Sequence, residues 1–244
     1  MSALSLERDP DGRAAIVQTD PRPHRLGVGR YEFDAAGDLV CAARVEVDLA
    51  DARTPIDLDD APLVVLNDAD LTYAKVRLDD RSLSTVEQSL DRVRDPLARG
   101  LIWSSLWNTT RDSELGAKRY QSMAQRFSPA ESHLTLLTSV LANAPYAIEH
   151  YLPETARGAA RREWLDHTWR ALWDAPPASG NQLAWARAVA AAAEVDDSRA
   201  EDIRSLLDTD GRAPAGLSLD PDLRWALRGA LAATGHADLS LIHI

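Results

Sequence analysis

The spacing of apolar residues changes once along the chain, near residue 80, and this change constrains the fold more than any other feature. Before it, apolar and polar residues alternate in two long runs, residues 25–33 and 39–49, and a period of two is typical of half-buried strands. After it, apolar residues recur at helical spacing, beginning with Leu83, Val86, Leu90 and Val93. The sequence therefore predicts an α+β fold, mostly α, in which a β part precedes a helical part.

We expect the β part to be a small antiparallel sheet or β-sandwich over roughly residues 12–79. The two alternating runs flank the turn residues 35–38, which include Gly37, and so form a hairpin. Residues 63–67 are a continuous apolar run, which indicates a more buried strand, whereas residues 73–79 alternate again. Residues 67–70 are expected to join these last two strands as a turn.

Acidic caps and prolines indicate where helices begin. Asp95 precedes Pro96 as an N-cap before a proline in the first turn, and Ser128 to Glu131 matches a capping box that is expected to open a helix. Pro145 is expected to begin a separate short helix that ends at Leu152. Further helices are expected at residues 114–127, from residue 153, and at residues 181–194, 198–207 and 221–233. Such helices favour a stacked HEAT-like or armadillo-like array, although no repeat consensus is present.

Composition excludes several classes of protein. The net charge of −11 argues against a general nucleic-acid binder, whose binding surface is basic. No apolar run approaches the roughly 18 residues of a membrane span, and charged residues interrupt residues 1–20, so no export signal is visible. Cys41 is the single cysteine, which excludes an internal disulfide and a cysteine-based metal cluster. These features favour a cytoplasmic protein with no nucleic-acid and no membrane partner.

No motif with catalytic chemistry is found. The six histidines are scattered and the HExxH zinc helix is absent, which favours surface or structural roles for His24, His133, His150, His167, His236 and His243. Gly27 and Gly29 lie inside a strand pattern and indicate a β-bulge rather than a phosphate-binding loop. Cys41 lies within a strand, where we expect a small buried hydrophobe rather than a nucleophile. We therefore assign no catalytic, cofactor-binding or metal-binding residue.

Two further patterns allow a structural and a functional interpretation. Trp103 and Trp107 are one helical turn apart, as are Trp169 and Trp173, and each pair suits core packing better than an aromatic platform for a ligand. The acidic run of residues 57–60 is most simply a solvated loop, with cation binding as the alternative.

Three segments taken together resemble one known family. They are Pro23–Tyr31 (PHRLGVGRY), Leu66–Asp79 (LNDADLTYAKVRLD) and Trp103–Asp112 (WSSLWNTTRD). In this order and at these distances they resemble the C-terminal half of zinc aminopeptidases of the aminopeptidase N family, in the form found in high-GC bacteria. Other members carry a Tyr-rich "GYYRV.YD"-like version of the second segment, from which this chain departs. The resemblance covers roughly residues 12–238.

The resemblance implies a parent enzyme of four domains, of which this chain would supply the last two. Residues 1–80 would be the small β-sandwich and residues 81–238 an incomplete helical domain that covers the active site and gates peptide access. The zinc ligands, HExxH and substrate loop belong to the catalytic domain, so this chain itself would hold no cofactor. Its implied partners are the catalytic domain of the same polypeptide and peptide substrates.

The last six residues, 239–244 (LSLIHI), differ in composition, because they hold two isoleucines where the first 238 residues hold five. The codons CTG-TCT-CTT-ATA-CAC-ATC would encode them, and that string matches a transposon end that is ligated in sequencing libraries. We interpret this segment as a non-native tail, with a genuine apolar tail as the alternative. An independent read of the locus distinguishes the two.

Two functions from different classes follow from the sequence. The first is a non-catalytic C-terminal fragment of a zinc aminopeptidase that removes N-terminal amino acids from peptides. The second is a stand-alone helical-repeat scaffold without enzymatic activity. An in-frame HExxH in the DNA upstream of Met1 would favour the first, whereas a promoter and a stop codon there would favour the second.

Overall fold

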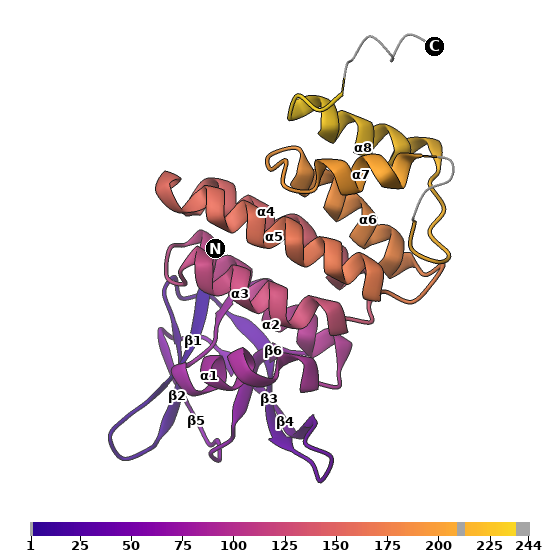
Figure 1. Cartoon of the computed structure of the whole chain (residues 1–244). Coiled ribbons are helices and arrows are strands. Elements are labelled where there is room, and N and C mark those ends of the chain that lie inside the picture. The colour runs from indigo at the N-terminus through magenta and orange to yellow at the C-terminus, as the bar shows by residue number, and fades with distance from the viewer. Residues whose placement is uncertain (1, 209–212, 238–244) are drawn as a thin grey trace. The chain divides into compact units, whose positions relative to one another are not determined.

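The computed structural model describes residues 2–208 and 213–237, and these form seven strands, eight α-helices and two short 3₁₀-helices (Figure 1). The chain divides into two compact units, residues 1–116 and residues 117–244. All of the strands lie in the first unit, together with the first two α-helices. The predicted fold class, a small β part followed by a larger helical part, is confirmed.

The strands of the first unit form two small sheets. Their bounds are β1 Ala3–Arg8, β2 Ala14–Gln18, β3 His24–Phe33, β4 Leu39–Leu49, β5 Arg53–Ile56, β6 Leu63–Asp68 and β7 Lys75–Arg77. One sheet has the order β5-β2-β1-β7 and the other has the order β4-β3-β6. The pairing is antiparallel except between β1 and β7, which are parallel.

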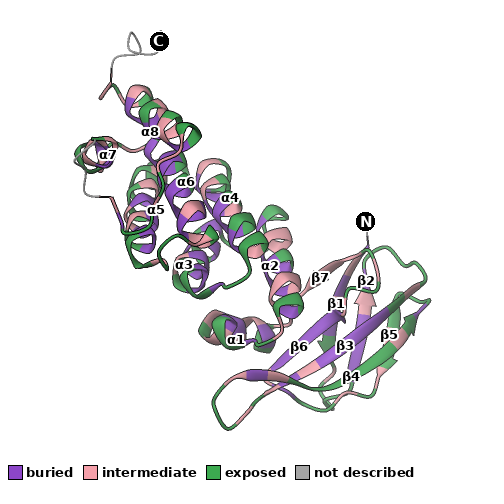
Figure 2. Ribbon diagram, turned by 90° about the vertical axis from the view of Figure 1, so that its right-hand side faces the viewer, coloured by how far each residue is buried: buried purple, intermediate pink, exposed green. Residues whose placement is uncertain are grey.

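The β core is built from alternating strand residues. Leu4 and Leu6 of β1 lie in the same buried cluster as Leu26 and Val28 of β3 and Leu66 of β6. Both faces of β6 are buried, as its continuous apolar run predicts. Figure 2 shows β3 and β6 largely buried and β4, at the edge of its sheet, largely exposed along its middle.

The helices follow in a regular order. Their bounds are α1 Asp80–Ser89, η1 Leu90–Arg92, α2 Pro96–Arg111, α3 Ala117–Phe127, η2 Ser128–Ala130, α4 Leu134–Tyr151, α5 Glu154–Asp174, α6 Gly180–Ala193, α7 Ala200–Leu207 and α8 Pro221–Ala233. In the second unit α3 packs on α4, α5 on α6 and α7 on α8, while α6 also contacts α4 and α8. Within this unit the helices therefore stack as successive hairpins (Figure 1).

Two sequence-based helix boundaries are wrong. Ser128 to Glu131 does not open a helix, because it forms the 3₁₀-turn η2 and α4 begins only at Leu134. Pro145 does not begin a separate helix either, since it lies inside the continuous helix α4. Helix α4 buries Leu137, Val140, Leu141, Ala144, Ala147 and Ile148 on both sides of the proline. Apolar packing along its whole length therefore outweighs the missing backbone donor.

The domain assignments rest on sequence. The change from strand to helix does fall at Asp80, yet the compact units divide between Gly116 and Ala117, because α1 and α2 pack on strands of the first unit. The boundary at residues 80 and 81 stays a prediction. The proposed non-native tail, residues 239–244, lies outside the residues that the structure describes.

Candidate functional site

The turn between β6 and β7 has the most unusual backbone in the first unit. Asn67, Ala69 and Asp70 have φ values of 57°, 76° and 54°, in the left-handed region that non-glycine residues seldom occupy. Such a conformation costs about 1 to 3 kcal/mol per residue where it is strained, and it persists only where its surroundings enforce it. Residues 67–70 are thus the turn that the sequence predicts, in a conformation that it does not reveal.

The Asn67 side chain holds this turn in place. It is buried, its Nδ2 donates to the carbonyl oxygen of Thr72 at 2.8 Å, and its Oδ1 accepts from the Thr72 backbone N–H at 3.0 Å. Nδ2 also donates to Asp70 Oδ1 at 3.2 Å. The loop that follows is thereby fixed by side-chain bonds and not by sheet pairing.

Asp68 anchors the start of the same turn from inside the β unit. Its carboxylate is fully buried, accepts a bond from the Tyr31 hydroxyl at 3.0 Å, and pairs with Arg44 Nε at 2.6 Å. Gly27 and Gly29 leave room for Asp68, because a Cβ on Gly29 would lie 2.3 Å from Asp68 Oδ2. The strand register shifts between Gly27 and Val28, so the predicted β-bulge is confirmed. Burial and the adjacent Asp68 raise the pKa of Tyr31, which stays protonated.

A cleft lies beside this turn. The β6–β7 segment lines one side, with Asn67, Asp70, Thr72, Tyr73, Ala74, Lys75 and Val76, and helix α2 lines the other, with Leu101, Ser104, Ser105, Asn108 and Arg111. Its volume of about 560 Å³ lies in the range of small-molecule sites. Ser105 Oγ donates to the Val76 carbonyl oxygen at 2.8 Å. This bond ties the helix to β7 beside the cleft.

Charges around the cleft are mostly paired. Lys75 Nζ donates to Asp112 Oδ1 at 2.8 Å, and Arg77 Nε donates to Glu114 Oε2 at 2.6 Å. The pKa of Asp112 is lowered, and the hydrogen bond from Lys75 is the largest cause. Arg111 also lines the cleft, but its guanidinium makes no ion pair with any residue in the described part of the chain.

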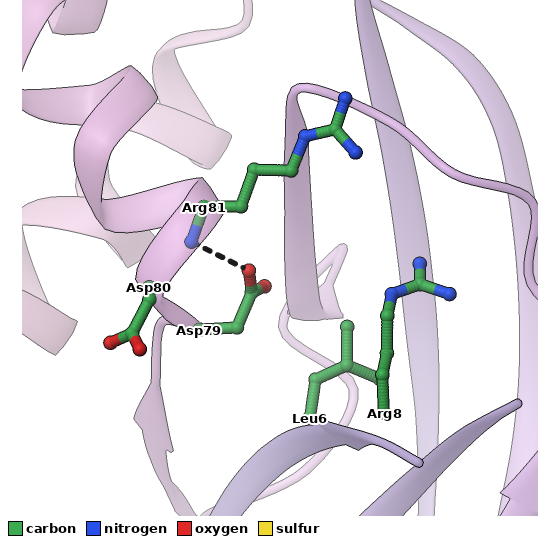
Figure 3. Close-up of a pocket in the computed structure, with 5 residues that line it drawn as sticks. All are labelled: Leu6, Arg8, Asp79, Asp80 and Arg81. Carbon is green, nitrogen blue, oxygen red and sulfur yellow. Dashed lines mark hydrogen bonds between the residues drawn. The ribbon is translucent and has the colours of Figure 1, made fainter. Parts of the chain in front are cut away.

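A second, smaller pocket of about 330 Å³ is lined by Leu6, Arg8, Asp79, Asp80 and Arg81 (Figure 3). Its polar groups cap a helix and form ion pairs within the first unit. Asp79 caps α1 by accepting bonds from the backbone N–H groups of Arg81 and Ser82, the first of which Figure 3 draws as a dashed line. The Arg81 side chain pairs with Asp60, and Arg8 lies 3.9 Å from the same carboxylate.

The helical unit has a third pocket, of about 460 Å³, which contains His167. The imidazole is 8% exposed, and its ring centroid lies 5.4 Å from those of Trp164 and Trp185. Burial, with a smaller contribution from Arg170, lowers the pKa of His167 to about 4. A neutral imidazole between two tryptophans is a packing element of this unit.

The structure does not bring together the five histidines that lie in its described ranges. His24 Nδ1 lies 2.7 Å from Thr72 Oγ1, His236 Nε2 lies 3.1 Å from Asp197, and His150 stacks on Tyr146. Within residues 2–208 and 213–237, no group of three or more His, Cys, Asp or Glu side chains is placed to hold a metal ion. The described residues therefore do not fit the zinc of the implied parent enzyme. His243 lies outside the described ranges.

The prediction that Cys41 is buried is wrong. It is exposed and not buried, because β4 is an edge strand whose middle faces solvent on both sides. Partial burial of its thiol and the nearby Asp68 carboxylate raise the pKa of Cys41. The thiol is therefore protonated and weakly nucleophilic.

The structure also shows how the tryptophan pairs and the acidic run of residues 57–60 are packed and paired. Trp103 is buried in α2, whereas Trp173 is 43% exposed and its ring centroid lies 6.0 Å from that of Trp169. Core packing thus accounts for Trp103 but not for all of the second pair. In the acidic run, Asp59 pairs with Arg30 at 2.8 Å and Asp60 pairs with Arg81.

The fold and the site define a class of protein. It combines a small two-sheet unit with stacked helical hairpins, and its described residues contain no metal-ligating cluster. None of the described helices is both long and apolar enough to cross a membrane. The model of the ERAP1-like C-terminal domain matches residues 63–241, and the chain belongs to this family.

One curated relative matches nearly the whole chain. The chain is 38% identical over 241 residues to aminopeptidase N of Streptomyces lividans, and the alignment covers 96% of this chain and 28% of that enzyme. The resemblance to the C-terminal portion of the aminopeptidase N family is therefore confirmed. The chain spans little more than a quarter of the length of this relative.

Proposed function

We propose that this chain works as the non-catalytic C-terminal part of an aminopeptidase N, an enzyme that removes N-terminal amino acids from peptides. The observation that carries the proposal is the alignment of nearly the whole chain with 28% of the Streptomyces lividans enzyme. The described residues supply no metal-ligating cluster, so zinc and the groups that activate water belong to another part of such a polypeptide. We place this function in the cytoplasm, because the single cysteine of this chain leaves no internal disulfide that an oxidising compartment would form.

Within that enzyme, the helical part covers the active site and limits which peptides enter. The stacked hairpins α3/α4, α5/α6 and α7/α8 support this proposal, because arrays of this type form extended curved surfaces. The catalytic part of the same polypeptide and peptide substrates are the partners that the proposal requires.

An activity assay on the purified chain tests the proposal. We expect no hydrolysis of an aminoacyl-anilide and no stoichiometric zinc, because the described residues lack a metal-ligating cluster. Hydrolysis with bound zinc would refute it. Translating the DNA upstream of Met1 separates this function from a stand-alone scaffold, since only the enzyme part requires an in-frame HExxH there.

Gating requires a longer polypeptide. In a chimera, this chain replaces the matching segment of the Streptomyces lividans aminopeptidase N. We expect deletion of α5 to α8 from the chimera to raise hydrolysis of long peptides relative to that of an aminoacyl-anilide, because the cover over the active site is lost. An unchanged ratio in a folded, active deletion variant would contradict gating.

A further inference from the structure

Two large apolar side chains of the β6–β7 loop point into solvent. Tyr73 is 83% exposed and Leu71 is 50% exposed, whereas the turn before them is buried at Asn67 and Asp68. Single exposed apolar residues are ordinary on protein surfaces. Two of them on one loop, next to a cleft, form a patch of the kind that marks interaction sites.

The loop that presents them is held in one conformation. Three left-handed residues, the buried Asn67 amide and the buried Asp68 carboxylate fix its start, and Lys75 N–H bonded to the Ser2 carbonyl oxygen fixes its end at 2.9 Å. A rigid loop loses little conformational entropy when it binds. Backbone conformations of this kind cluster at active sites, ligand clamps and switch regions.

Arg111 supplies a charge beside the same patch. It lines the cleft together with Tyr73, and it has no ion-pair partner among residues 2–208 and 213–237, whereas Lys75 and Arg77 are paired with Asp112 and Glu114. An exposed guanidinium next to apolar side chains fits a partner that presents a carboxylate, through a bidentate bond.

The net charge of this chain and the greater length of its relative indicate which partner occupies the surface. A second copy is disfavoured, because the chain carries a net charge of −11 and like copies repel. The relative that matches 96% of this chain extends far beyond the match, since the chain covers 28% of it. The protein surface contributed by the rest of such a polypeptide is therefore the natural occupant.

We propose that Leu71, Tyr73 and Arg111 form a docking surface for the catalytic part of an aminopeptidase N polypeptide. That part would present an apolar recess for Leu71 and Tyr73, bordered by a carboxylate for Arg111. The inference rests on the proposed function and names the surface through which this chain joins the enzyme.

The test compares the same substitutions in two proteins, the isolated chain and the chimera with the Streptomyces lividans enzyme. Leu71→Ser, Tyr73→Ser and Arg111→Gln are made in both. In the isolated chain we expect the thermal midpoint to stay unchanged, because the three side chains are exposed or unpaired. In the chimera we expect each serine variant to speed limited proteolysis by about tenfold or more, as truncation of an interface anchor does.

Phe33→Ser is the matched control, because Phe33 lies in the same unit and is 47% exposed. It should leave proteolysis of the chimera unchanged. An active chimera whose proteolysis the three substitutions do not change would overturn the docking surface and leave the proposed function standing. An inactive chimera would overturn both. Equal destabilisation of the isolated chain and the chimera would assign these residues to the fold and overturn the docking role.

Discussion

At the residue scale, the first unit depends on space for one buried acid. Asp68 is fully buried, and Tyr31, Arg44 and two glycines surround it. The glycine pair predicts the bulge, because glycine inside a strand pattern marks a close backbone approach. Nothing in the sequence predicts that an aspartate fills the space. Asp68 lies in a turn, where acids are ordinary, and its burial follows only from the way β3 and β6 pair.

Gly29→Ala should destabilise the protein by about 1 to 3 kcal/mol, as overpacking of a filled site does. The added Cβ would lie 2.3 Å from Asp68 Oδ2 and 2.9 Å from Tyr31 Cε2, both in buried residues that cannot easily move. Urea unfolding measures the change. Gly158→Ala in α5 is the control, because its Cβ meets nothing within 4 Å, and it should stabilise the helix by about 0.5 to 1 kcal/mol. A neutral Gly29→Ala would contradict this account of the bulge.

His167 should make the helical unit sensitive to acid. Its pKa of about 4 in the folded chain is below the ordinary 6.5, so between these values the unfolded chain binds a proton that the folded chain does not. The stability that His167 contributes is therefore fully present above about pH 6.5 and is lost as the pH falls toward 4.

The substitution His167→Phe removes this titration and retains a ring between Trp164 and Trp185. We expect the fall in unfolding free energy from about pH 7.5 to about pH 4.5 to be smaller in the variant by about 2 kcal/mol. Urea unfolding at the two pH values measures it. An identical fall in both proteins would show that His167 is protonated without cost in the folded chain.

At the scale of elements, the strands and helices could be predicted where their patterns are long. The hairpin β3–β4, the buried strand β6 and the cap Asp95 all follow from local sequence. The unpredicted strands β1, β2 and β5 are short. Strand β2 has no alternation, and β5 contains Pro55, which is tolerated there because β5 is at the edge of its sheet. Tertiary pairing, which no local pattern reveals, defines these strands.

In helix α4 a local sequence rule gave a wrong prediction. Pro145 was expected to begin a new helix, but packing keeps α4 continuous through it. Pro145→Ala should raise the unfolding free energy by up to about 3 kcal/mol, since alanine restores a backbone donor inside a continuous helix. Chemical denaturation measures this. A loss of stability would indicate instead that the neighbouring helices require the bend that a proline imposes.

At the scale of the whole molecule, the resemblance indicated the family correctly, but physical patterns alone could not indicate the function. The residues show a β unit, an array of helices and no metal-ligating cluster among those described, and many unrelated proteins share such a description. The cleft between the β6–β7 segment and α2 was not predicted either. Its walls come from segments far apart in the sequence, which the packing of α2 on β6 and β7, the Ser105–Val76 hydrogen bond and the Lys75–Asp112 ion pair bring together.

The most direct test of the central claim measures aminopeptidase activity in three proteins side by side. They are the isolated chain, the Streptomyces lividans aminopeptidase N without the segment that matches it, and the chimera in which this chain fills that place. We predict that the isolated chain is inactive and that the chimera hydrolyses an aminoacyl-anilide far faster than the shortened enzyme. Hydrolysis by the isolated chain, or a chimera no more active than the shortened enzyme, would contradict the claim.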